Sequence, residues 1–312
     1  MKENPAPGFL PLTGLYEPSA IVQLPDGRFL VVEDEKEHPF SVLSISSQGC
    51  VSSSPLTPGL FESSDGFWKL DDLEGLALDR SGAIYAITSQ SLAGDGDQKK
   101  SREKLVRFRV EGDRVVAPAS FKGLKSALVA AHPELATAAR VTDVKGGGGL
   151  NVEALELSAE QAPDRQRLLV GFRGPLLDGY AIIATVENPF GIFENDEAPR
   201  VEPSLVTLDL GGNGIRGMSH IPDLNGFLVI GGPVSKESSL FELWFWSGKP
   251  EAAARRVSIP GLSGLEHAEG VCPAIIDGQS KIVIVSDDGD RARGRFSQFL
   301  MLDPGQIEIA AA

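Results

Sequence analysis

The sequence predicts an all-β protein, a five-bladed β-propeller with four-stranded antiparallel blades and a short helical insertion near residues 121–140. Two observations predict it. Short runs of valine, isoleucine and leucine alternate with turns along the 312 residues, which include 35 glycines and 21 prolines, a pattern typical of strands joined by tight turns. One kind of strand entrance also recurs about every sixty residues, which indicates a radial repeat.

The recurring entrance places an acidic or polar residue and then a small residue before an apolar strand. Its clearest copies are Asp71–Leu78, Leu150–Leu157 and Glu266–Val271, with variants at Glu17–Val22 and Gly214–Met218. Aligning the small residue gives five key residues, which lie 55, 79, 63 and 53 positions apart: Ser19, Glu74, Glu153, Arg216 and Glu269. We therefore predict five innermost strands, one in each blade.

Each blade is expected to follow its innermost strand in chain order. Blade one is predicted at Ala20–Leu24, Arg28–Glu33 and Phe40–Ser46, with a Pro25-Asp26-Gly27 hairpin turn. Blade two is predicted at Gly75–Leu78, Ala83–Ser89, Lys104–Val110 and Arg114–Ala117. Blade three is predicted at Val152–Leu157, Arg167–Phe172, Tyr180–Val186 and Ser204–Leu210, and blade four at Gly217–Ile221, Phe227–Gly231, Phe241–Trp246 and Arg255–Ile259. Blade five is predicted at Gly270–Ile276, Lys281–Asp287, Ser297–Leu302 and Ile307–Ala310.

The insertion and the closure of the ring complete the prediction. Leu124, Ala127, Leu128 and Ala131 recur at helical spacing, so a helix is expected where the repeat lengthens to 79 residues. Phe9–Leu12 is expected to complete the last blade beside Gln306–Ala310, because sharing both ends of the chain removes a free sheet edge. Residues 1–312 would then form a single domain.

Charge and composition limit the partners. The chain has 29 Lys and Arg against 43 Asp and Glu, a net charge of −14, which repels phosphate backbones and argues against nucleic-acid binding. The basic run Lys99–Lys104 is interpreted as a solvated loop. No apolar segment is long enough to cross a membrane, so we expect a cytoplasmic monomer or weak oligomer. Cys50 and Cys272 are expected to stay reduced.

In a propeller the innermost strands begin on one face, so the five key residues should form a ring at one mouth of the channel. Three glutamates there would repel one another unless a cation neutralises them. Two cations stay open as alternatives. A Ca²⁺ ion would take oxygen ligands from Ser19, Glu74, Glu153 and Glu269, whereas Arg216 would bind the glutamates directly.

The ends of the second strands return to the same face and should add further polar groups. Arg173, between glycines, is a candidate anion receptor. Asp287 and Asp288 would ligate a metal or position water, and the alternative is a hydrogen-bonded Asp-Gly turn at Asp287-Asp288-Gly289. His267, two residues before Glu269, is a candidate general base or else an ordinary loop histidine.

Several of these motifs together resemble a bacterial family of propellers named domain of unknown function 3616. They are Asp72–Gly75, Asn151–Ala154, Gly171–Pro175, Arg216–Met218, Glu269–Val271 and Ser286–Gly289. The family is similar to phytase-like esterase propellers, which implies hydrolysis of phosphate or other esters. The ring also resembles that of the calcium-activated nucleotidases (apyrases), which implies Ca²⁺ at Ser19, Glu74, Glu153 and Glu269. Arg216 departs from that pattern.

Two functions follow as expectations. The first is a Ca²⁺-dependent hydrolase whose substrate is a small anionic ester, a phosphate ester. Arg173 and Arg216 would bind the anion, and Asp287 or His267 would orient water. The second is a non-catalytic propeller that binds a small ligand or a protein partner at the same mouth. In that case the Glu/Arg ring would be structural.

Overall fold

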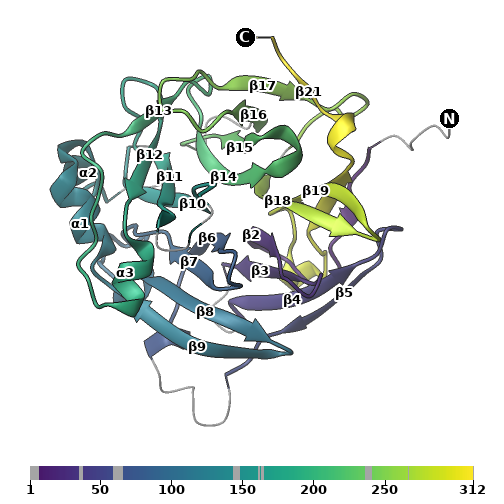
Figure 1. Cartoon of the computed structure of the whole chain (residues 1–312), viewed down its shortest axis with the longest axis horizontal. Helices are drawn as coiled ribbons and strands as arrows, with labels where there is room; N and C mark the ends of the chain where they lie inside the picture. Colours follow the sequence, from purple (N-terminus) through teal and green to yellow (C-terminus); the bar gives the residue numbers. More distant parts are fainter. Residues whose placement is uncertain are drawn as a thin grey trace.

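The computed structural model describes residues 7–34, 38–58, 66–142, 148–160, 162, 165–235, 241–265 and 267–311. Five β-sheets stand around a central axis, and each begins with a strand at the centre (Figure 1). The innermost strands contact their neighbours all the way round, including β18 against β2. The predicted five-bladed propeller is therefore confirmed.

The blades are antiparallel and run outward in chain order. Blade one contains β2 (Pro18–Gln23), β3 (Phe29–Glu33), β4 (Phe40–Ile45) and β5 (Val51–Pro55). Blade two contains β6 (Leu73–Leu78), β7 (Ile84–Thr88), β8 (Leu105–Glu111) and β9 (Arg114–Phe121). Blade three contains β10 (Asn151–Leu157), β11 (Leu168–Gly174), β12 (Ala181–Val186) and β13 (Val206–Leu208).

Blade four contains β14 (Gly214–Ile221), β15 (Gly226–Gly232), β16 (Glu242–Trp246), β17 (Arg255–Ser258) and β21 (Glu308–Ile309). Blade five contains β18 (Ala268–Ile276), β19 (Gln279–Ser286), β20 (Gln298–Leu302) and β1 (Leu10–Pro11). The helices are α1 (Leu124–Ala131), α2 (Pro133–Ala138) and α3 (Pro189–Glu194). Short 3-10 turns lie at Gly66–Trp68, Lys100–Arg102, Pro222–Leu224, Arg291–Arg293 and Pro304–Gln306.

Each end of the chain adds a strand to a blade, but the two terminal strands join different blades. The N-terminal strand β1 completes blade five, as predicted, but it pairs with β20, Leu10 opposite Phe299. The C-terminal strand β21 instead pairs with β17 of blade four, Val257 opposite Ile309. The capped turn Pro304–Gln306 separates β20 from β21. The expectation that β21 belongs to blade five was therefore wrong.

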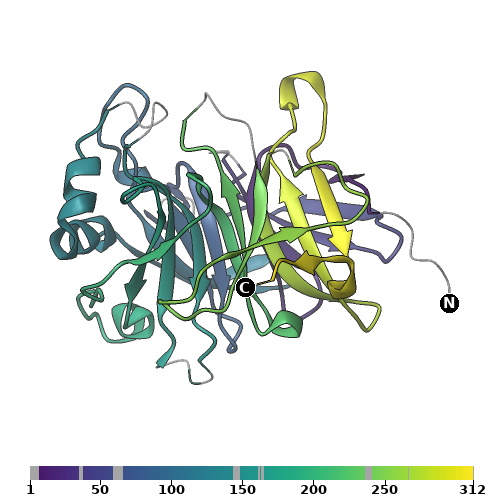
Figure 2. The ribbon, with the colours of Figure 1, turned by 90° about the horizontal axis from the view of Figure 1, so that it is seen from above.

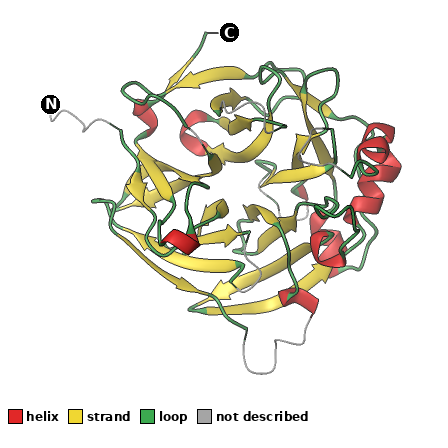
Figure 3. Ribbon diagram, turned by 180° about the vertical axis from the view of Figure 1, so that it is seen from behind, coloured by secondary structure: helices red, strands yellow, loops and turns green. Residues whose placement is uncertain are grey.

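Three further elements differ from the prediction, and each lies at the periphery (Figure 3). The sequence reading missed β5 because its polar residues are mostly exposed and show no apolar alternation. It also missed the six-residue α3, which begins with a proline. The helical insertion is confirmed as α1 and α2, but Phe121 belongs to β9. No helix in the described part of the chain is long and apolar enough to span a membrane.

The core lies between adjacent blades. The side view in Figure 2 shows the sheets standing steeply around the axis, so apolar side chains from one blade meet those of the next. Trp244 and Trp246 of blade four, for example, pack with Ala154 and Ile183 of blade three. Burying one such large apolar side chain contributes about 2 kcal/mol. A blade alone would expose these surfaces, so the ring is the folding unit.

Candidate functional site

All five key residues occupy the same backbone feature, a β-bulge near the start of the innermost strand. Pairing with the second strand shifts register around Ser19, Glu74, Glu153, Arg216 and Glu269. A bulged residue is left out of the ladder, and such bulges commonly aim a side chain at a functional site. The repeated sequence motif is thus the signature of five equivalent bulges.

The small residue after each key residue is required by the close approach of neighbouring innermost strands. A Cβ atom on Gly217 would lie 2.0 Å from the carbonyl oxygen of Glu269. One on Gly75 would lie 2.8 Å from the Cβ atom of Leu155. Both contacts are too close for a side chain. These glycines therefore let adjacent blades draw the key residues together around the channel.

The five key residues line one cavity of about 580 Å³ at this end of the channel, which we call the first mouth. Its described lining carries seven carboxyl groups and three guanidinium groups: Asp34, Asp72, Glu74, Asp95, Glu153, Glu269 and Asp287, with Arg102, Arg173 and Arg216. Arg173 and Asp287 thus lie where the sequence predicted them. His267 is exposed and absent from this lining, and its ring packs 5.7 Å from that of Phe241.

Arg216 bridges two of the three ring glutamates. Its Nε lies 2.9 Å from Glu153 Oε2, and its Nη2 contacts Glu269 Oε1. The Nε contact is a close ion pair whose angle does not make a hydrogen bond. The side chains of Glu153 and Glu269 are 5% and 8% exposed. A pair this well buried is strongly destabilised when one partner is removed.

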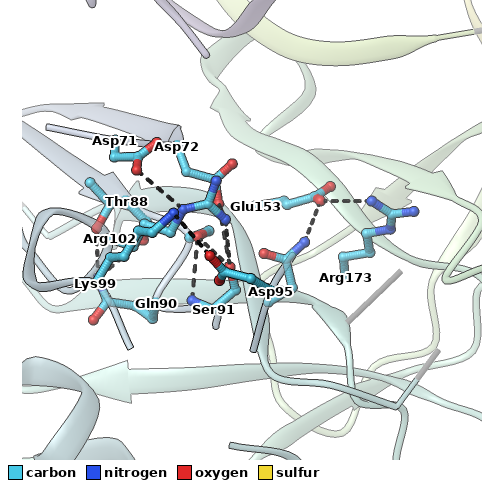
Figure 4. Close-up of polar contacts among 12 residues, drawn as sticks. Asp71, Asp72, Thr88, Gln90, Ser91, Asp95, Lys99, Arg102, Glu153 and Arg173 are labelled. Carbon is cyan, nitrogen blue, oxygen red and sulfur yellow. Dashed lines mark hydrogen bonds and ion pairs between the residues drawn. The ribbon is translucent and has the colours of Figure 1, made fainter. Parts of the chain in front are cut away.

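Glu153 receives two further donors. Arg173 Nη1 lies 3.2 Å from Glu153 Oε1, and Asn151 Nδ2 donates to the same oxygen at 2.6 Å (Figure 4). Arg173 Nε donates in turn to the carbonyl oxygen of Pro233 at 3.0 Å. Glu153 is therefore held by two guanidinium groups and an amide.

Two other carboxyl groups of this mouth, those of Glu74 and Asp287, have no partner among the described residues. The carboxyl group of Glu74 makes no hydrogen bond or ion pair with any residue that the structure describes. Burial, together with the charges of Asp72 and Glu153, raises its pKa well above the usual value. Burial and nearby Glu17 likewise raise the pKa of Asp287 to about 6. Glu74 is consequently the ring glutamate whose neutral form the site favours.

Asp34 and Asp287 occupy equivalent positions at the ends of second strands. Their backbone N–H groups donate to the carbonyl oxygens of Glu17 and His267, at 3.2 and 2.7 Å. Asp34 is the more exposed of the two. Partial burial in the mouth and the charge of Asp72 raise its pKa to about 7. His267 thus positions Asp287 through its backbone.

Asp288 has a structural role, as the turn interpretation of this segment predicts for it. Its carboxylate accepts hydrogen bonds from Ser286 Oγ at 2.8 Å and from the backbone and side chain of Gln298 at 3.0 and 2.6 Å. These donors occupy both carboxylate oxygens. Asp287, the residue before it, is therefore the aspartate of this pair that faces the cavity.

Arg102, which was not predicted as a site residue, also lines the first mouth. Arg102 Nη1 lies 3.0 Å from Asp72 Oδ2, and Ser91 Oγ donates to the same oxygen at 3.3 Å (Figure 4). Arg102 Nε also lies 3.5 Å from Asp71 Oδ2. The run Lys99–Lys104 is therefore not simply a solvated loop, since Arg102 is half-buried against two aspartates. Only the fold brings these partners together.

Of the four predicted calcium ligands, two are free to bind an ion and two are bound by Arg216. The hydroxyl of Ser19 and the carboxyl of Glu74 line the cavity and are free of partners within the described chain. Glu153 and Glu269 are engaged by Arg216 instead. Across the described residues, no three His, Cys, Asp or Glu side chains are grouped as metal ligands. As arranged here, the predicted four-ligand set does not fit one ion.

The fold and the mouth define a five-bladed propeller with a charged polar cavity at one end of its channel. Residues 131–303 match the family described as Protein of unknown function (DUF3616). This match spans more than half of the chain, so the protein belongs to that family, as the sequence motifs indicated. No curated protein matches the sequence.

Solved structures with a similar chain path are distant in sequence. A glucose dehydrogenase-like oxidoreductase of Thermus thermophilus is 17% identical, with 95% of this chain and 100% of that chain covered and a TM-score of 0.46. A PQQ-bound aldose sugar dehydrogenase of Streptomyces coelicolor is 16% identical, with coverages of 98% and 99% and a TM-score of 0.46. A gluconolactonase of Xanthomonas campestris is 10% identical, with coverages of 96% and 90% and a TM-score of 0.41. Likenesses this remote carry no argument about activity.

Proposed function

We propose that the protein is a hydrolase whose active site is the first mouth. The observation that supports this most is the contrast between Glu74 and Glu153. Glu74 is half-buried, without a partner among the described residues, and has a raised pKa, whereas Glu153 is held by Arg173 and Arg216. A buried carboxyl group with a raised pKa at the mouth of a cavity, beside paired charges, is a usual feature of an acid–base site.

The roles follow from the protonation states. Glu74, whose raised pKa favours its neutral form, would donate a proton to the leaving group. Asp287, with a pKa of about 6, would be largely ionised near pH 7 and would accept a proton from the attacking water. Arg173 and Arg216 would stabilise negative charge that develops on the substrate. His267 would act only through its carbonyl, which fixes the backbone of Asp287.

A Ca²⁺-dependent hydrolase of a phosphate ester is the finer form of this proposal. Its support is electrostatic, because seven carboxyl groups against three guanidinium groups would repel an anionic ester. A divalent cation near Ser19 and Glu74, with Asp34 and Asp287 as the available further carboxylates, would reduce that repulsion. In this form Glu74 would be an ionised ligand and not the proton donor. Such an ion would supply Lewis-acid polarisation of the ester. The two arginines would bind the anion.

The second candidate is a non-catalytic propeller that binds a small ligand at this mouth. It is favoured by the bridge from Arg216 to Glu153 and Glu269, which joins β10, β14 and β18 and so ties three blades together. In this case the carboxyl groups would select the ligand, and no bond would be broken. Binding without turnover would distinguish this candidate from the hydrolase.

The test is a panel of chromogenic substrates that comprises a carboxylic ester, a glycoside, a phosphate monoester and a phosphate diester, each with EDTA or with added Ca²⁺. The proposal predicts turnover of at least one substrate, reduced about 100-fold or more in Glu74→Gln and in Asp287→Asn. Glu308→Gln, on the exposed strand β21, is the matched control and should retain wild-type activity. Turnover of a phosphate ester only with Ca²⁺ would establish the finer form.

Two outcomes would contradict the hydrolase. The first is no turnover across the panel by folded wild-type protein. The second is turnover that survives in both Glu74→Gln and Asp287→Asn. Either result would leave ligand binding as the function to examine at the first mouth.

A further inference from the structure

The opposite end of the channel carries a second cavity, of about 270 Å³, which we call the far mouth. It is lined by residues from the other ends of the five innermost strands. Between the two mouths the open space narrows to about 10 Å³, where the lining includes Leu76, Leu155, Met218 and Val271. A ligand could not pass through so small a space. The far mouth is therefore a separate cavity.

Glu156, at the end of β10, is the central polar group of the far mouth. Its Oε2 accepts from Ser219 Oγ at 2.7 Å and from the backbone N–H of His220 at 2.9 Å, and its Oε1 accepts from the backbone N–H of Leu157 at 2.8 Å. A carboxylate has about four acceptor positions. Three are filled, so one remains, on Oε1.

This carboxylate has no cationic partner in the described part of the chain. Arg80 and His220 line the same cavity, and neither forms an ion pair with it. Burial raises the pKa of Glu156 to about 7 in spite of its three donors. The remaining lining is largely apolar and includes Val22, Leu78 and Pro273. A carboxylate in such surroundings is costly unless a cation accompanies it.

Joining two blades does not by itself require a charge. At the same mouth Gln23 joins blades one and five with a neutral amide, which donates to the carbonyl oxygen of Ile275 at 2.9 Å and accepts from its N–H at 2.7 Å. Glu156 joins blades three and four in the same manner, through Ser219 and His220. A glutamine could accept from Ser219 and His220, but its amide nitrogen would then face the N–H of Leu157, so the three donors account for a carboxyl group at this position. They do not account for the missing cationic partner or for the acceptor position left on Oε1, and these two features point to a ligand.

We propose that the far mouth binds a small molecule with a protonated amino group on an apolar body. The amino group would donate to the free position on Glu156 Oε1, and the apolar body would contact Val22, Leu78 and Pro273. This would be a second site, independent of the function proposed for the first mouth. A charge-assisted hydrogen bond of this kind favours the amine over a neutral alcohol of the same shape.

The experiment is calorimetric titration at about pH 8 with benzylamine and with benzyl alcohol as its neutral counterpart. Wild-type protein should bind benzylamine saturably and at least tenfold more tightly than benzyl alcohol. Glu156→Gln, which keeps the acceptor for Ser219 and His220, should lose that preference. Ala159→Trp, at the exposed rim of the cavity, should weaken binding without touching the carboxylate.

The acidic first mouth is the competing location for an amine. Asp287→Asn, which removes a carboxylate of the first mouth that is ionised at pH 8, must therefore leave benzylamine affinity unchanged, and loss of binding in that variant would overturn the proposal. Absence of saturable binding by wild-type protein would also overturn it. Equal affinity for benzylamine and benzyl alcohol would do so as well, as would unchanged affinity in folded Glu156→Gln.

Discussion

Glu74 and Glu153 come from the same motif, sit on equivalent bulges and face the same channel, yet their surroundings are opposite. Glu153 is contacted by Arg173, Arg216 and Asn151. Glu74 has no hydrogen-bond or ion-pair partner among the described residues, and the negative charges of Asp72 and Glu153 act on it more strongly than the positive charge of Arg216. The difference arises from Arg216, which stands where three other blades carry glutamate, and from Arg173 and Asn151 of blade three. A repeat thus supplies equivalent backbone sites, and the residues around them make two of the glutamates chemically different.

The largest expected effect is the removal of Arg216. Arg216→Met should lower the free energy of unfolding by about 3–5 kcal/mol at neutral pH, because it leaves Glu153 and Glu269 buried without their cation. Urea unfolding measures this directly. Arg167→Met is the matched control, since its ion pair with Glu202 is largely exposed and should contribute less than about 1 kcal/mol. Similar losses in both variants would show that Arg216 does not bridge the ring.

The next prediction concerns the pH dependence of the proposed activity. If ionised Asp287 accepts the proton from water, kcat/KM should rise as pH increases through about 6 and should level off above it. Asp34 also titrates nearby, with a pKa of about 7. Asp34→Asn should therefore leave this limb in place, while Asp287→Asn should abolish it. If Asp34→Asn abolished this limb and Asp287→Asn left it in place, Asp287 would not be the residue that accepts the proton.

The smallest expected effect is that of a divalent cation. Added to chelator-treated protein, Ca²⁺ should raise the thermal midpoint by a few degrees in a saturable manner, as ligand linkage requires. The rise should vanish in Glu74→Gln and persist in Glu153→Gln, because only Glu74 is free of the arginines. If the rise in thermal midpoint were lost in Glu153→Gln alone, Glu153 would be a Ca²⁺ ligand, as the sequence predicted.

The sequence predicted the parts of this protein that depend on local repetition. The five entrances could be aligned because each bulge needs a small residue, Gly75 or Gly217 for example, to admit the neighbouring strand. The short edge strand β21 could not be assigned, since two residues carry no pattern that specifies a partner. The polar strand β5 was missed for a related reason, because an exposed edge strand needs no apolar alternation.

The sequence predicted which residues line the candidate site but not which of them contact one another. Ser19, Glu74, Glu153, Arg216 and Glu269 all line the predicted mouth, and the sequence left open whether Arg216 or Ca²⁺ neutralises the glutamates. The contacts of Arg216 depend on side-chain directions that spacing alone does not specify. Arg102 was missed because Asp71 and Asp72 lie about thirty residues away in sequence and are brought to it by the fold.

The most direct test compares Glu74→Gln with Glu153→Gln in their free energies of unfolding at about pH 7.5 and pH 4. The folded-state pKa of Glu74 is raised, so its contribution to stability is fully present below the unfolded value near 4.5 and is lost as pH rises above it. Glu74→Gln should therefore be more stable than wild type at pH 7.5, and this gain should disappear near pH 4. Glu153→Gln should be less stable than wild type at pH 7.5, because it breaks the contacts with Arg173 and Arg216. Changes of the same sign in both variants at pH 7.5 would contradict the account.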